Sequence, residues 1–178
     1  MSDEARKAHH EAGHAVFATI KGIPYRSVFL RKDDGQGYSG AVDVTEAELR
    51  AWIQAAPEPE RQIRVDYVVQ FKAIGVLAAR RYATEAGFSP DIGTDFNDEL
   101  QLRNLFYEFA RDPSGTLLDG QAKLDRSQHL RGKAQQLLED PIFWRAISTV
   151  AQKLQALGEL SSAETAEIAR ELLCSESY

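Results

Sequence analysis

The segment His10-Glu11-Ala12-Gly13-His14 combines three side chains that could bind and use a metal ion. Histidines four residues apart lie on one face of an α-helix, a single turn from each other, so both imidazoles can reach one ion. Zinc takes nitrogen or sulfur donors at about 2.0–2.3 Å, and a catalytic zinc keeps one position open for water. Glu11 is placed to accept a proton from that water as a general base. The spacing predicts metal-assisted hydrolysis. The alternative is that His10 and His14 are two solvated side chains on an ordinary helix.

A third metal ligand has to come from elsewhere in the chain. His9 points about 100° away from His10 on a helix and cannot share its metal. The polar neighbours of His129 indicate a surface position. Position 20 holds Ile20 where a metzincin has histidine, which excludes that class. Carboxylates are most abundant in the segment Asp91–Asp98. These acids could equally cap the helix that follows, so ligation and capping both remain open.

Composition limits the class of protein. The chain has 178 residues, of which 43% are hydrophobic and 27% charged, as expected for one globular domain with a real core. A net charge of −6 argues against nucleic-acid binding, which requires clustered Lys and Arg. Neither a signal peptide nor a long apolar run is evident. The single cysteine, Cys174, excludes an internal disulfide and a cysteine-based zinc finger. We expect a cytoplasmic protein with no nucleic-acid partner and no direct membrane anchor.

Hydrophobic periodicity and turn residues predict a mostly α fold with a small β hairpin. A capping box of Thr45 and Glu48 should start a short helix. The other expected helices are residues 3–21, 60–84, 95–111, 116–139, 141–157 and 163–174. Strands are expected at residues 27–31 and 38–44. We expect a single domain over residues 1–178, in which residues 1–44 supply the active-site helix and the β pair and residues 45–178 form a helical bundle.

The segment Gly35-Gln36-Gly37-Tyr38-Ser39-Gly40 matches the pattern G-x-G-x-x-G of dinucleotide sites. In such sites the last glycine opens a helix whose N-terminus receives the pyrophosphate. The residues that follow here are strand-like instead. We therefore expect these glycines to make hairpin turns and not to bind a nucleotide.

Several segments resemble, in order, the peptidase domain of FtsH-type zinc metalloproteases, the proteolytic half of membrane AAA proteases. The similar segments are His10–Val16 (the opening motif), Val28–Arg31 with Gly37-Tyr38 (a strand and turn), Ile74–Ala79 (a helix), Gly93–Asp98 (the segment with the third zinc ligand), and Leu157–Ser162 with Glu167-Ile168 (a C-terminal helix pair). The resemblance implies a zincin-like helical metallopeptidase domain that holds Zn²⁺ with His10, His14 and Asp98.

The chain departs from this family at three places. Four residues separate Gly93 from Asp98 where the family has three, so Asp95 is a rival third ligand. Ala79 stands where the family carries Glu, which removes a hydrogen bond that could orient a ligand. We also expect that no AAA module, Walker loop or membrane anchor precedes Met1. We therefore expect the polypeptide substrate to be unfolded, short, or delivered by a partner protein. The chain could instead act as a homo-oligomer.

The expected function is that of a zinc metalloendopeptidase, in which Glu11 is the general base for a metal-activated water. The resemblance also implies that the strand near Val28–Arg31 presents an edge to an extended peptide. The alternative is a non-catalytic helical interaction module that keeps the metalloprotease fold, with or without zinc. Ala79 and the missing motor favour the module, whereas the intact motif opposes it because a purely structural zinc has no use for Glu11.

Overall fold

The structure is a computed structural model that describes residues 3–33, 37–88 and 104–174. The fold is mostly α-helical with a small antiparallel sheet, as the periodicity predicts. Residues 104–109 are also helical. The other elements are α1 (Asp3–Lys21), β1 (Ser27–Lys32), β2 (Tyr38–Val42), α2 (Glu46–Gln54), α3 (Glu60–Glu85), α5 (Gly120–Glu139), α6 (Pro141–Leu157), β3 (Glu159–Ser161) and α7 (Ser162–Cys174).

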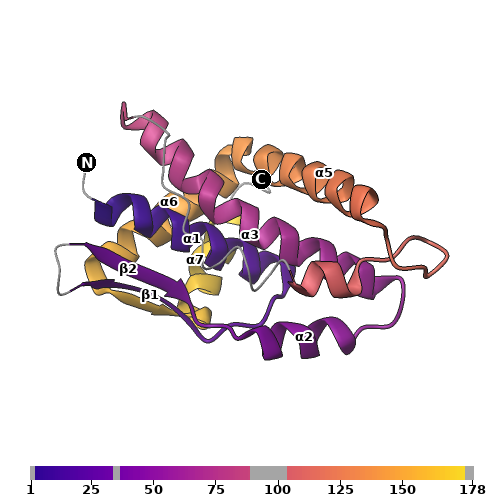
Figure 1. Ribbon diagram of the computed structural model, residues 1–178. Helices are drawn as coiled ribbons and strands as arrows, with labels where there is room; N and C mark the ends of the chain where they lie inside the picture. Colours follow the sequence, from indigo (N-terminus) through magenta and orange to yellow (C-terminus); the bar gives the residue numbers. More distant parts are fainter. Residues whose placement is uncertain (1–2, 34–36, 89–103, 175–178) are drawn as a thin grey trace.

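Helix α1 is the central element of the fold. It packs against α3, α6 and α7 and against strands β1 and β2, while α5 covers the far side of α3 (Figure 1). Small residues allow this close packing. A Cβ atom added at Gly13 would lie 3.0 Å from the Cβ of Ala78 and 3.3 Å from the Cα of Gly75, so α1 and α3 nearly touch there. Because the middle of α1 is enclosed, the polar side chains of His9, His10, Glu11 and His14 are buried and need partners.

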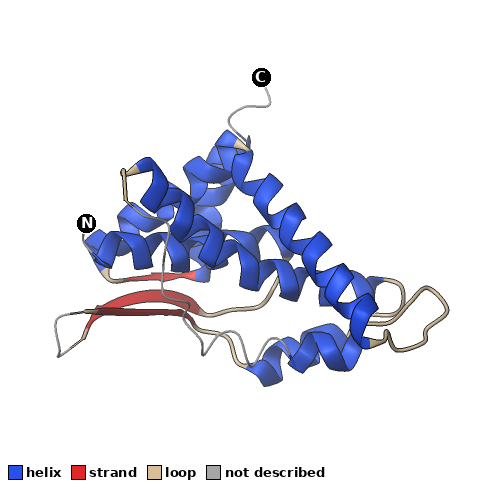
Figure 2. Ribbon diagram, turned by 45° about the horizontal axis from the view of Figure 1, so that its top comes forward, coloured by secondary structure: helices blue, strands red, loops and turns tan. Residues whose placement is uncertain are grey.

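The sheet has three strands in the order β2-β1-β3, all antiparallel (Figure 2). Val28 of β1 lies opposite Val42 on one side and Leu160 on the other. The expectation of a two-stranded hairpin is therefore incomplete, because the C-terminal part of the chain adds β3. The expectation that Val28–Arg31 presents a free edge is wrong, since β1 is the central strand. Among the described strands, β2 has the longer outer edge without a neighbouring strand.

Most predicted helix boundaries agree with the structure, with two differences. The predicted helix 95–111 is helical only to residue 109, and its start lies outside the described residues. Helix α5 begins at Gly120 and not at residue 116, because Arg111 and Leu117 form an antiparallel bridge. Asp119 then caps α5 by accepting a hydrogen bond from the backbone N–H of Ala122. The pairing of Arg111 with Leu117 takes these residues out of helical geometry. It explains why one helix ends at residue 109 and why α5 starts only at Gly120.

The predicted capping box is present, since Thr45 and Glu48 bond reciprocally at the start of α2. Strand β2 ends at Val42 and not at residue 44, because the N–H of Val44 turns back to the carbonyl of Val42 at 2.9 Å. Within the described ranges, none of the helices combines the length and apolar composition that a membrane span requires.

Candidate metal centre

His10 and His14 face each other on one side of α1, as their spacing predicts. Their Nε2 atoms lie 3.1 Å apart, and the ring planes cross at 80°. Both side chains are buried, with exposed fractions of 7% and 4%. Two nitrogens that bind one tetrahedral zinc at about 2.0–2.1 Å are themselves separated by about 3.3 Å. The two imidazoles therefore have the spacing that a single ion requires.

Helix α3 fixes the orientation of the His14 ring. The Nδ1 atom of His14 lies 2.6 Å from the backbone carbonyl oxygen of Phe71. A carbonyl only accepts, so Nδ1 carries the proton and donates it, and Nε2 of the neutral ring keeps its lone pair. Metal-binding histidines are commonly held in this way by a partner on the second ring nitrogen. Sequence reasoning did not identify the Phe71 carbonyl, because no residue type marks a backbone acceptor.

The His14 ring occupies the space that Gly75 leaves open on α3. A Cβ atom at Gly75 would lie 2.4 Å from Nε2 and 2.6 Å from Cε1 of His14. Glycine in a helix interior costs about 0.5–1 kcal/mol relative to alanine, so its position there calls for a packing reason. An isolated glycine inside a predicted helix was the sequence signal that could have identified this contact.

The side chain of Glu11 extends from α1 toward β2 and is buried, with an exposed fraction of 6%. A Cβ atom at Gly40 would lie 2.6 Å from Cγ and 3.1 Å from Oε1 of Glu11. Gly40 lies inside β2 opposite Leu30, so the expectation that this glycine makes a hairpin turn is wrong. Because Gly40 has no side chain, the backbone of β2 can contact the Glu11 carboxylate directly. The expectation that the pattern runs into a strand is confirmed, because β2 begins at Tyr38 and continues through Gly40 to Val42.

The other two histidines lie away from this pair, as expected. The Nδ1 of His9 is 2.7 Å from the carbonyl oxygen of Ala5, and its ring stacks on Tyr82 with centroids 4.0 Å apart. Burial lowers the pKa of His9 below its ordinary value of 6.5, although the hydrogen bond to Ala5 opposes this effect. His129 is exposed on α5. Neither side chain joins His10 and His14.

The third ligand remains a prediction. Asp91, Asp95 and Asp98 lie outside the described residues. In the part of the chain that the structure describes, no three His, Cys, Asp or Glu side chains form a group that could hold a metal. Ala79 is buried in α3, with 1% of its surface exposed, where the resemblance would place a carboxylate. The described residues thus supply two oriented nitrogen donors and a neighbouring carboxylate, a donor set that fits zinc.

No protein-family model matches the chain, and a comparison with curated proteins finds no match either. The likeness to FtsH-type peptidases therefore remains an inference from the sequence motifs.

Proposed function

We propose that this protein is a zinc-dependent metallopeptidase with a zincin-like fold of the FtsH type. The observation that carries the proposal is the 3.1 Å approach of the Nε2 atoms of His10 and His14. The hydrogen bond between His14 Nδ1 and the Phe71 carbonyl supports it, because that bond leaves Nε2 as the donor atom. His10, His14 and Asp98 would hold the ion, with Asp95 as the rival third ligand.

Glu11 is the residue that would move protons during peptide hydrolysis. A bound zinc lowers the pKa of its water toward neutrality and polarises a carbonyl group. Glu11 follows His10 directly, and the backbone of Gly40 limits the positions its carboxylate can take. From there Glu11 accepts a proton from water and gives it to the leaving amine.

The outer edge of β2 provides a route for an extended substrate beside Glu11. The N–H of Asp43 donates to the carbonyl of Ser27, so this residue faces β1. Alternate residues of an antiparallel strand face the same side, which directs both backbone groups of Gly40 and the N–H of Val42 to the outer edge. Pairing along an edge strand uses backbone hydrogen bonds and gives loose side-chain specificity. We propose that the substrate strand pairs with β2.

The decisive experiment compares Glu11→Gln with wild-type protein on labelled casein, with zinc content measured by elemental analysis. We expect cleavage to fall by about 10²–10⁴-fold while zinc content stays unchanged, because only the base is removed. Glu171→Gln, which changes an exposed glutamate of α7, is the matched control and should behave as wild type. Undiminished cleavage by Glu11→Gln would show that the base is another group.

The metal itself is tested separately. His14→Ala should lose zinc, and only one of Asp98→Ala and Asp95→Ala should do so, which identifies the third ligand. A wild-type protein that binds no zinc contradicts the proposal. Wild-type protein that binds zinc but cleaves nothing would indicate the alternative, a non-catalytic interaction module, which the buried Ala79 favours.

A further inference from the structure

A groove separate from the histidine pair lies between α3, α5 and the helix at residues 104–109. Its main cavity has a volume of about 320 Å³, and a second cavity of about 60 Å³ shares three of its lining residues. The apolar part of the wall consists of Val69, Phe106, Tyr107 and Leu124. Tyr107 and Leu124 are exposed, which makes them accessible to a ligand. The volume is at the small end of ligand pockets, which suits a compact ligand.

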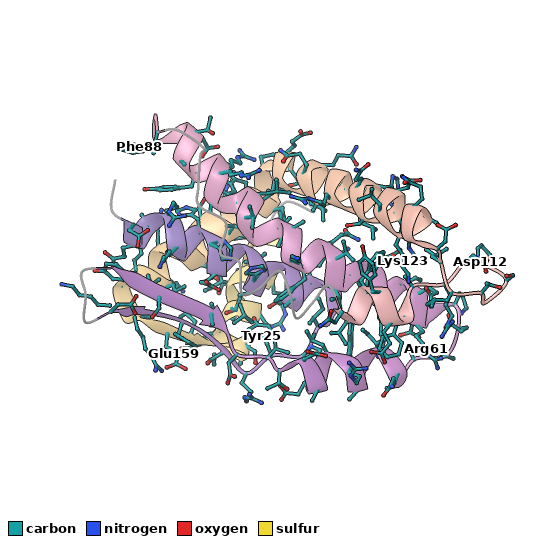
Figure 3. The ribbon with its side chains drawn as sticks, viewed as in Figure 1. Tyr25, Arg61, Phe88, Asp112, Lys123 and Glu159 are labelled. Carbon is teal, nitrogen blue, oxygen red and sulfur yellow. The ribbon has the colours of Figure 1, made fainter. Side chains whose placement is uncertain are left out.

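Lys123 lines this groove although only 8% of its surface is exposed. Its Nζ atom lies 5.2 Å from the centre of the Tyr107 ring, and Figure 3 shows the residue beside the segment that carries Tyr107. No ion pair joins Lys123 to a carboxylate among the residues described here. Lysine is almost never buried to this degree unless it is paired. A negatively charged ligand in the groove would supply the missing ion pair.

The charge of the groove is complementary to such a ligand. Lys123, Ser127 and Arg131 follow one another at four-residue intervals on α5, and each lines one or both cavities. Among the residues that the structure describes, no acidic side chain lines either cavity, in a chain whose net charge is −6. The linings combine the cations Lys72, Lys123 and Arg131 with apolar side chains, a composition that fits a molecule with an anionic head group and an apolar chain.

We infer that this groove binds a medium-chain carboxylate, with its head group at Lys123 and its apolar chain along Val69, Phe106 and Leu124. The groove is lined by residues of α3 other than Phe71 and Gly75, which contact His14, so the inference does not depend on the proposed peptidase activity. A carboxylate paired with a buried ammonium forms a charge-assisted contact, which a neutral head group cannot replace.

The test titrates the whole protein with decanoate and with decanol by calorimetry, below the concentration at which either ligand aggregates. We expect decanoate to bind at least about tenfold more tightly than decanol, because only decanoate pairs with Lys123. Lys123→Met keeps the apolar stem and removes the charge, so decanoate should weaken by about tenfold while decanol is unchanged. Lys153→Met, which changes an exposed lysine of α6, is the matched control and should bind decanoate as wild type.

A second variant keeps the test informative if Lys123→Met fails to fold. Ser127→Leu should fill the shared space while leaving Lys123 in place, so both ligands should be lost. Equal affinity of wild-type protein for the two ligands, or unchanged decanoate binding by Lys123→Met, would overturn the inference. Binding of an acidic apolar peptide, or dimerisation of the chain, without decanoate binding would assign the groove to a different occupant and equally overturn it.

Discussion

Replacing Gly75 by alanine would put a methyl group where the His14 ring lies. The new Cβ atom would be 2.4 Å from His14 Nε2, whereas ordinary contact begins at 3.4 Å, so the ring must move by about 1 Å. Zinc–ligand distances tolerate only about ±0.2 Å. We expect zinc affinity to fall about 100-fold, the upper end of the effect of losing a ligand-orienting partner. That loss corresponds to about 2.8 kcal/mol.

Stability should change much less than zinc affinity. Overpacking costs about 1–3 kcal/mol, and alanine regains about 0.5–1 kcal/mol in a helix interior, so the variant should lose between about 0 and 2.5 kcal/mol. Gly132→Ala is the matched control, because a Cβ atom at that helical glycine of α5 meets nothing within 4 Å. It should gain about 0.5–1 kcal/mol and keep full zinc affinity.

The assay is competition with a chromophoric zinc chelator, together with urea unfolding of the zinc-free proteins. If Gly75→Ala binds zinc as tightly as wild type and is stabilised as much as Gly132→Ala, then the His14 ring does not lie over Gly75 and the reasoning fails. Lost zinc affinity in both variants would show that the effect is not specific to the contact with His14.

Three other predictions test neighbouring contacts. Gly40→Ala should displace the Glu11 side chain, because its Cβ would lie 2.6 Å from Cγ, and should lower casein cleavage at least about tenfold with zinc content unchanged. The lowered pKa of His9 implies stability that is full above about pH 6.5 and is lost as the pH falls through the folded pKa. His9→Gln should therefore lose less urea resistance than wild type between pH 7.5 and pH 5. Arg126→Met removes the 2.7 Å partner of Asp66, whose pKa burial already raises. We expect a loss of about 1–3 kcal/mol at pH 7 and a loss that becomes smaller as the pH falls and Asp66 takes up a proton, measured by urea unfolding.

The sequence was sufficient for the elements that local residues specify. Helix α1 spans Asp3–Lys21 as predicted, because acids begin it and Gly22-Ile23-Pro24 ends it. The same helical geometry places His10 and His14 on one face whatever the rest of the fold does, so their pairing follows from spacing alone. The capping box of Thr45 and Glu48 at the start of α2 is equally local.

The tertiary structure decided what contacts those side chains. Strand β3 covers only Glu159–Ser161 and exists because β1 pairs with it, so no local pattern marks it. The partner of His14 is a carbonyl 57 residues away in the sequence, and Gly40 and Gly75 matter because another element comes close to them. Helix periodicity is set by backbone geometry within a few residues. Which backbone approaches which side chain depends on how the elements pack together.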